Sequence, residues 1–125
     1  MWINNLLINQ VRNHNRSRLN FCKGLNILYG QNGAGKTTVL ESIAVCGFSK
    51  SFLSVPDNSL VQIGNDFLHV KAEAFTDLDI PYKVRVRYFP GRRKEISSNA
   101  GDNLSPKDII GEIPLTVLSP DFRNI

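Results

Sequence analysis

The order of apolar and polar residues predicts short strands around a single helix in the first half of the chain. Residues 3–11 are apolar and β-rich and predict a strand, and residues 18–21 predict a second one after a polar turn. A short apolar run over residues 25–29 leads directly into Gly30 and predicts a buried strand. From Lys36 onward the apolar period becomes helical, which predicts a helix over about residues 35–46.

The second half of the chain has the pattern of an antiparallel β-meander. Residues 68–74 and 82–89 each alternate between apolar and polar side chains, as half-buried strands do. Pro90 and Gly91 predict a type II turn into a third strand over residues 92–97. The expected fold class is therefore α/β, with mixed α+β character.

Shorter elements are predicted between and after these strands. The polar stretch over residues 47–66 contains one helical turn at about residues 59–63. Ser105 as N-cap and Pro106 as first helical residue predict a helix over residues 107–111. The apolar residues 115–118 predict a final strand.

Composition excludes several classes of protein. The chain has 125 residues, 42% of them hydrophobic and 21% charged, which fits one globular domain or part of one rather than intrinsic disorder. No stretch approaches the roughly 20 apolar residues of a membrane span, and asparagines interrupt the apolar N-terminus, which therefore lacks the core of a signal peptide. We expect a soluble, cytoplasmic protein without a membrane partner, in which Cys22 and Cys46 are buried free thiols and exposed His14 and His69 have no special role.

Cations are segregated along the chain, which carries a net charge of +4. Residues 1–36 contain five Lys or Arg and no acid. A second acid-free tract, over residues 83–94, contains Lys83, Arg85, Arg87, Arg92, Arg93 and Lys94. The first three of these alternate along one predicted strand and project from one face. The tract suits contacts to DNA phosphates, although an ordinary solvated face has the same pattern.

One motif carries readable chemistry. Residues 30–37 match G-x-x-x-x-G-K-[ST] at every fixed position, and they lie between a predicted strand and a predicted helix. The residues of this loop are Gly30, Gln31, Asn32, Gly33, Ala34, Gly35, Lys36 and Thr37. In such a P-loop the backbone N–H groups surround a phosphate, the lysine reaches the β- and γ-phosphates, and the threonine hydroxyl ligates Mg²⁺. The sequence therefore predicts nucleotide and Mg²⁺ binding.

Hydrolysis needs a second acidic centre, which is an apolar strand that ends in Asp. Residues 115–118 end in Ser-Pro instead, and Asp121 follows three residues too late. Either the chain is an unusual nucleotide binder, or the second half of the site lies outside it. A guanine nucleotide is disfavoured because no N-K-x-D element occurs.

Further motifs extend the pattern beyond the P-loop. L-I-N-Q-V-R-N ends at Asn13, F-x-x-G-L-N-I-L-Y precedes Gly30, and G-Q-N-G-A-G-K-T-x-x-L-E-S-I ends at Ile43. K-S-F, L-V-Q-I-G and P-L-T-V-L-S-P-D-F follow in order. With these motifs the chain resembles the N-terminal part of the RecF family, which is related to SMC and ABC ATPases. It departs from the family at Val11, where an aromatic residue is usual, and at Leu53, where Arg is common.

The resemblance implies the first lobe of an ABC-type P-loop ATPase head, with residues 1–125 forming an incomplete head. The signature and Walker B motifs of the family have no counterpart here, so this chain alone would be inactive and the whole protein a weak ATPase. ATP and Mg²⁺ are the implied ligands, with Arg12, Asn13 and Thr38 beside the P-loop as further nucleotide contacts. The implied partners are DNA, a second copy of the protein in an ATP-dependent homodimer, RecR and RecO, and the RecA filament whose loading they assist.

Glu41 lies four residues after Thr37 and is expected to be a structural salt-bridge partner rather than a catalytic acid.

Two alternative functions remain open from the residues alone. Another SMC-like head, or a P-loop kinase or nucleotide-binding module without DNA function, would share the motif. A kinase is disfavoured because 29 β-like residues precede Gly30 and the later arginines lie on predicted strands.

Overall fold

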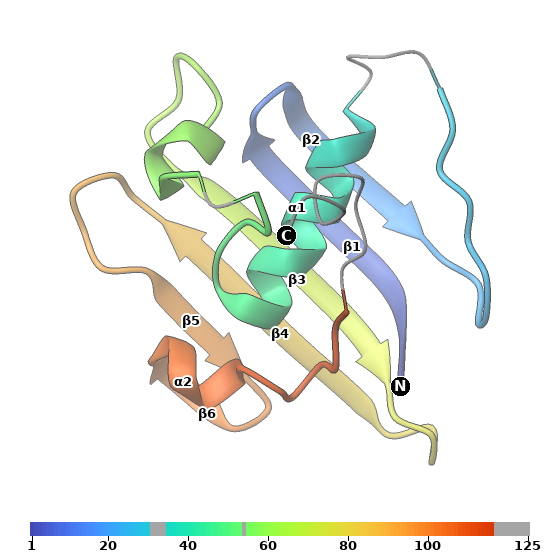
Figure 1. Ribbon diagram of the computed structural model, residues 1–125. Coiled ribbons are helices and arrows are strands. Elements are labelled where there is room, and N and C mark those ends of the chain that lie inside the picture. Colours follow the sequence, from blue (N-terminus) through green and yellow to red (C-terminus); the bar gives the residue numbers. More distant parts are fainter. Residues whose placement is uncertain (31–34, 54, 117–125) are drawn as a thin grey trace, which may run out of the picture.

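The computed structural model describes residues 1–30, 35–53 and 55–116. It consists of one antiparallel sheet of six strands in the order β2-β1-β3-β4-β5-β6, with a long helix, α1, across one face (Figure 1). The strands are β1 (Trp2–Val11), β2 (His14–Asn20), β3 (Leu68–Phe75), β4 (Pro81–Tyr88), β5 (Glu95–Ser98) and β6 (Gly101–Leu104). The helices are α1 (Lys36–Phe48), a 3₁₀ turn η1 (Asp57–Leu60) and the short α2 (Pro106–Ile109).

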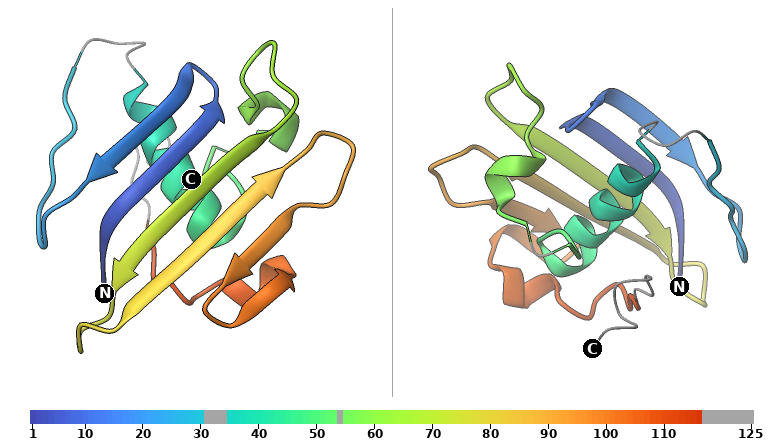
Figure 2. Two further views of the ribbon diagram at one scale, coloured as in Figure 1. Left: turned by 180° about the vertical axis from the view of Figure 1, so that it is seen from behind. Right: turned by 45° about the horizontal axis from the view of Figure 1, so that its top comes forward.

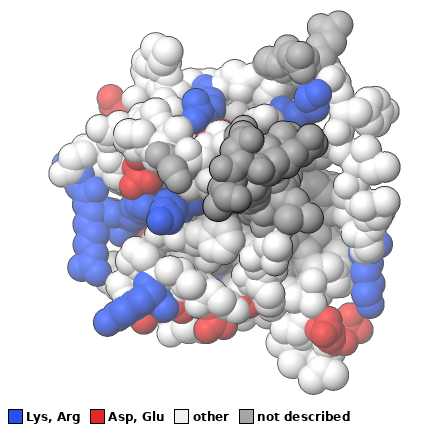
Figure 3. Space-filling model, in the orientation of Figure 1, with Lys and Arg blue, Asp and Glu red and all other residues white. Residues whose placement is uncertain are grey.

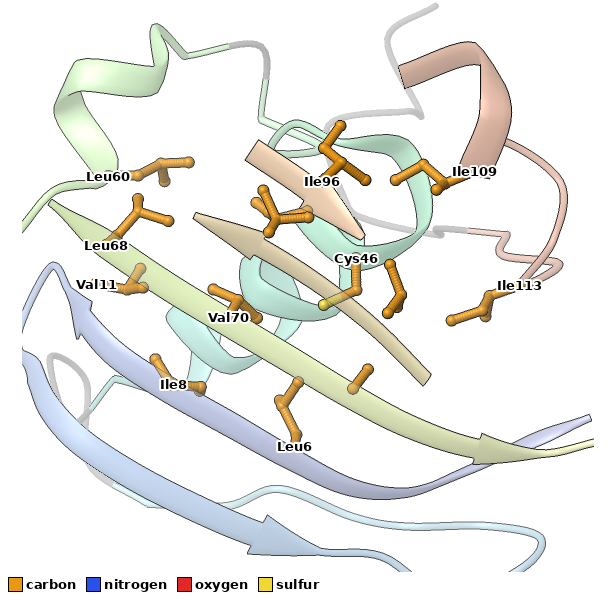
Figure 4. Close-up of a cluster of buried hydrophobic side chains, with 14 of the residues drawn as sticks. Leu6, Ile8, Val11, Cys46, Leu60, Leu68, Val70, Ile96, Ile109 and Ile113 are labelled. Atoms are coloured by element: carbon orange, nitrogen blue, oxygen red, sulfur yellow. The ribbon is translucent and has the colours of Figure 1, made fainter. Parts of the chain in front are cut away.

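The core lies between the sheet and α1. Alternate residues of the three central strands, among them Leu6, Ile8 and Val70, are fully buried and point toward the helix (Figure 4). Cys46 from α1 and Ile109 from α2 complete the same cluster. Because side chains alternate along a strand, the intervening residues point to the opposite, open face of the sheet.

Most predicted elements are confirmed. The strands at β1, β3 and β4 and the helix α1 lie within two residues of their expected bounds. The turn at Pro90 and Gly91 is present, with Gly91 at φ +82° and Arg92 N–H donating to the Phe89 carbonyl. Ser105 and Asp108 form the capping box that starts α2, and the Ser105 backbone N–H and hydroxyl lower the pKa of Asp108.

The buried strand expected over residues 25–29 is wrong. Among the described residues no strand pairs with this segment, and Leu25, Ile27 and Tyr29 are 85%, 73% and 90% exposed. Within this segment the Asn26 side chain accepts from the Cys22 N–H and donates to the Cys22 carbonyl, which closes a local turn. Without a neighbouring strand, the backbone N–H and C=O groups of an apolar run have no hydrogen-bond partners in a sheet. Apolar character alone therefore wrongly predicted a strand here.

Smaller differences also have local causes. The β1–β2 connection is tighter than expected, since Val11 pairs with His14 and leaves a two-residue turn. The expected strand over residues 92–97 begins only at Glu95, and the helical turn expected near residues 59–63 lies earlier, at η1. Thr116 is in no strand, and residues 117–118 of the predicted last strand lie outside the described residues.

The two thiols differ. Burial raises the pKa of the Cys46 thiol to about 12, so this thiol is an inert part of the core. Cys22 is exposed, contrary to expectation, because it lies in the turn that precedes the unpaired segment. Among the described residues no helix is long and apolar enough to cross a membrane.

Candidate functional site

The start of α1 carries the described part of the P-loop. Gly35 precedes the helix in the left-handed conformation, at φ +92°, and no side chain caps the helix N-terminus. The first turn contains no acid, so its free N–H groups and the positive end of the helix dipole favour an anion. The Lys36 ammonium donates to the Gly30 carbonyl at 2.6 Å, which places it over the start of the loop. The predicted contacts Gln31, Asn32, Gly33 and Ala34 lie outside the described residues.

His14 supports this glycine from the β1–β2 turn. Its Nε2 lies 2.9 Å from the Gly35 carbonyl oxygen, and its Nδ1 lies 2.7 Å from the Ser17 hydroxyl. A carbonyl can only accept, so Nε2 carries the proton toward Gly35. A Cβ on Gly35 would lie 2.3 Å from this Nε2, so the close approach requires glycine.

Sequence reasoning missed His14 because its role depends on the two-residue turn. Pairing of Val11 with His14 brings the imidazole back toward the start of α1, 21 residues later in the chain. Asn13 shares the turn, with its side-chain oxygen 3.1 Å from the same Cβ position of Gly35. The structure therefore places Asn13 beside Gly35 and adds His14 to the same position, while a nucleotide contact by Asn13 stays a prediction.

The partly buried Arg12 and the fully buried Glu41 form an ion pair beneath the site. Arg12 Nε lies 2.8 Å from Glu41 Oε1, and Nη2 donates to Oε2 at 3.1 Å. Ser51 Oγ donates to the same Oε2 at 2.8 Å, so the fully buried carboxylate is satisfied from two elements. The expectation that Glu41 is a structural ion-pair partner is confirmed. A nucleotide contact by Arg12 stays a prediction, since its guanidinium is bound to Glu41.

The two threonines differ in accessibility. Thr37 is exposed in the first turn of α1, whereas Thr38 is 4% exposed and its carbonyl accepts from the Ser42 hydroxyl. The described residues contain no group of three or more His, Cys, Asp or Glu side chains that could hold a metal ion. An exposed hydroxyl fits Mg²⁺, which commonly binds one or two protein groups and completes its shell with phosphates and water.

The basic tract divides into two groups. Lys83, Arg85 and Arg87 point to the open face of the sheet, as their alternation predicted. The hairpin cations lie elsewhere: the Arg92 guanidinium lies 5.8 Å from the Phe89 ring centroid, and Lys94 is bound to the Ser49 carbonyl and to Asp57 at 3.0 Å. Cations gather beside the β4–β5 hairpin along one edge of the helix side of the molecule (Figure 3).

Comparison with known proteins identifies relatives of this chain. Residues 5–109 match the family described as AAA domain. The chain is 30% identical over all 125 residues to the DNA replication and repair protein RecF of Thermoanaerobacter sp. (strain X514), of which it covers 34%. It is 37% identical over 97 residues, 78% of its length, to RecF of Chloroherpeton thalassium, of which it covers 26%. The chain thus spans about a third of the length of the curated relatives it matches.

Solved structures show the same fold. The recombination mediator protein RecF-ATP of the RecFOR pathway superimposes with a TM-score of 0.90 at 25% identity, over 96% of this chain and 32% of that one. A structure from work on ATP-driven dimerisation of SMC ATPases superimposes with a TM-score of 0.75 at 18% identity, over 99% of this chain and 96% of that one. The mixed α/β fold is that of RecF and SMC-type ATPase heads. The chain therefore belongs to the AAA domain family, and over its whole length it is related to the N-terminal part of RecF.

Proposed function

We propose that this chain is the ATP-binding lobe of a RecF-type ATPase that acts in DNA replication, recombination and repair. The observation that carries the proposal is the start of α1, where an uncapped helix N-terminus, the left-handed Gly35 and Lys36 occupy the positions that phosphate binding requires. The similarity to RecF-ATP, at a TM-score of 0.90, supports ATP as the nucleotide.

ATP binding uses the loop from Gly30 to Thr37, with Thr38, Arg12 and Asn13 beside it. The Lys36 ammonium leaves the Gly30 carbonyl for the β- and γ-phosphates, a stronger charge-assisted partner. The Thr37 hydroxyl supplies one ligand to Mg²⁺, and the bound ion neutralises phosphate charge. His14 holds Gly35 in place from the neighbouring turn, in which Asn13 lies beside the same glycine.

The rest of the proposal concerns the whole protein. Residues 1–125 supply the P-loop half of an ABC-type head, and the part of the relatives that this chain does not cover supplies the signature and Walker B motifs. ATP then favours a homodimer that binds DNA in the cytoplasm and works with RecR and RecO in loading RecA. The proposed DNA contacts are the six cations of residues 83–94, of which Lys83, Arg85 and Arg87 share one exposed surface.

Calorimetry with Mg·ATP on the full-length protein tests the nucleotide assignment. Lys36→Ala removes the charge that faces the phosphates, and we expect binding to fall below detection. Lys107→Ala, which removes an exposed lysine in the first turn of α2, is the matched control and should bind as the wild type does. Unchanged ATP affinity in Lys36→Ala, with the fold retained, would refute the proposal.

A further inference from the structure

The β3–β4 turn displays two aliphatic side chains at the surface of the molecule. Leu78 is 82% exposed and Ile80 is 54% exposed, in a connection that consists of residues 76–80. Turn positions usually hold Gly, Asn, Asp, Ser or Pro, each of which suits a particular turn backbone. Single exposed aliphatic residues are ordinary on protein surfaces, but two of them in one short turn indicate a surface that another molecule covers.

The turn is held in one conformation by its own hydrogen bonds. The Thr76 N–H donates to the Ile80 carbonyl, and the Asp79 N–H donates to the Thr76 carbonyl, each at 2.9 Å. The Thr76 hydroxyl oxygen accepts from the N–H groups of Leu78 and Ile80, at 3.3 Å and 3.1 Å. Asp79 adopts the left-handed conformation, at φ +61°, which a short polar side chain tolerates. A turn fixed in this way loses little conformational entropy when its side chains enter a binding pocket.

The end of the sheet beside this turn is apolar as well. Trp2, Phe75 and Pro81 are cross-strand partners on β1, β3 and β4. The rings of Trp2 and Phe75 lie against each other, with their centroids 5.5 Å apart. Ala74 is buried on the α1 side of β3, so Phe75 points to the open face of the sheet. This row and the turn form one surface, called the apolar end, which consists of Trp2, Phe75, Leu78, Ile80 and Pro81.

Acidic side chains border the apolar end. Asp77 and Asp79 flank Leu78 in the turn, and acids gather at this end of the molecule, at the lower right of Figure 3. Asp77 pairs with the Met1 ammonium at 2.6 Å, whereas Asp79 is exposed and forms no ion pair with another described residue. An apolar centre with a charged rim is the usual anatomy of a protein–protein interface.

The apolar end lies far from the nucleotide site. Views from two sides show the β3–β4 turn and the start of α1 at opposite ends of the sheet (Figure 2). The ten residues of β1 span most of this separation, which is about 30 Å at about 3.3 Å per residue. A ligand at the apolar end therefore does not touch the P-loop.

The chemistry of the apolar end favours a different protein over DNA or a second copy of this chain. The five residues include no cation, and the neighbouring carboxylates repel phosphates. A two-fold contact between copies would bring the same surface of each together and would place Asp79 near its own counterpart, at a cost in like-charge repulsion. The complementary surface is an apolar pocket with Lys or Arg side chains at its border.

We propose that the apolar end binds a partner protein, with Leu78 and Ile80 in an apolar pocket and Asp79 facing basic side chains at the border of that pocket. The inference rests on the protein partners of the proposed function, RecR and RecO, and gives them a contact surface. Because the P-loop lies at the other end of the sheet, substitutions at the apolar end should leave Mg·ATP binding unchanged.

The test measures the binding of purified RecR and of purified RecO to the full-length protein by biolayer interferometry with Mg·ATP present. Leu78→Asn/Ile80→Thr removes both aliphatic side chains but keeps residue types that suit a turn and the start of a strand. Affinity for at least one of the two proteins should fall about tenfold or more, since burial of a single aliphatic side chain accounts for about that factor. Ile110→Thr, which removes an exposed isoleucine beside α2, is the matched control and should bind as the wild type does.

The charged border is tested separately. Asp79→Asn keeps a residue type that tolerates the left-handed conformation but removes the charge. Association with the same partner should become slower and less dependent on salt, because complementary charges at an interface mainly raise the association rate. Calorimetry with Mg·ATP and thermal melts of every variant establish that the nucleotide site and the fold are intact.

Each other outcome overturns the inference. Wild-type affinity of Leu78→Asn/Ile80→Thr for both proteins would do so while RecR and RecO remain partners. If the wild type binds neither protein, the partner part of the proposed function fails as well. If the double variant melts at a clearly lower temperature with no partner present, the rest of the same chain covers the apolar end. If sedimentation shows that only the double variant fails to self-associate, the occupant is a second copy.

Discussion

The contact between His14 and Gly35 sets the position of the last P-loop glycine. The Gly35 carbonyl accepts from His14 Nε2 at 2.9 Å and from the Val39 N–H at 3.2 Å, so it is fixed from the turn and from the helix. The spacing of the motif predicted Gly35, Lys36 and Thr37 without the fold. It could not predict His14, because that contact arises from the register of the β1–β2 hairpin.

Loss of the His14 donor should weaken nucleotide binding. His14→Phe keeps a ring of similar size but removes the hydrogen bond, which contributes about 0.5–1.5 kcal/mol. We expect affinity for Mg·ATP, measured by calorimetry on the full-length protein, to fall by about 2- to 10-fold. His14→Gln retains an amide donor and should recover part of the loss. Equal affinities in the wild type and His14→Phe would contradict a positioning role.

At the scale of elements, Glu41 joins three parts of the fold. It lies on α1, binds Arg12 at the end of β1, and accepts from Ser51 in the segment after the helix. The Arg12 N–H also donates to the Leu60 carbonyl at 2.8 Å, which ties η1 to the same point. The orientation of the helix that begins at the P-loop therefore depends on one buried carboxylate.

Removal of this carboxylate should destabilise the protein. Glu41→Ala leaves the partly buried Arg12 guanidinium without its counter-charge and the Ser51 hydroxyl without its acceptor, at a cost of about 2–4 kcal/mol in the free energy of unfolding. The matched control is Glu73→Ala, which breaks a half-exposed pair with Lys71 and should cost under about 1 kcal/mol. Urea denaturation of both variants measures the difference. Equal losses would show that the Glu41 network contributes little.

The spacing of apolar residues predicted most elements, because an element with one buried face carries its apolar residues at the period of its own geometry. Residues 68–74 alternate since one side chain in two faces α1, and the buried residues of α1 recur at intervals of three to four positions. Residues 25–29 were wrongly expected to be buried because apolar character does not reveal whether a neighbouring strand exists. Beside this segment lies an apolar hollow of about 390 Å³, lined by Trp2, Phe21, Leu25 and Leu40 among others, that the described residues leave open.

At the scale of the whole molecule, the sheet separates two surfaces of different chemistry. The face toward α1 holds the core and positions the P-loop, and the open face carries the cations. Charge segregation in the sequence predicted a polyanionic partner, but it assigned Arg92, Arg93 and Lys94 to the same patch as Arg85. The register instead joins Arg85 to Lys71 and Arg18, which no linear pattern could show.

The central claim is that one protein couples ATP at the P-loop to DNA binding. Its most direct test is the affinity of the full-length protein for a short duplex, measured by fluorescence anisotropy at fixed salt with and without Mg·ATP. The account predicts that Mg·ATP tightens duplex binding by the wild type, and that Lys36→Ala binds the duplex equally weakly in both conditions. A wild-type affinity that is the same with and without Mg·ATP, at nucleotide concentrations shown by calorimetry to saturate the site, would contradict it.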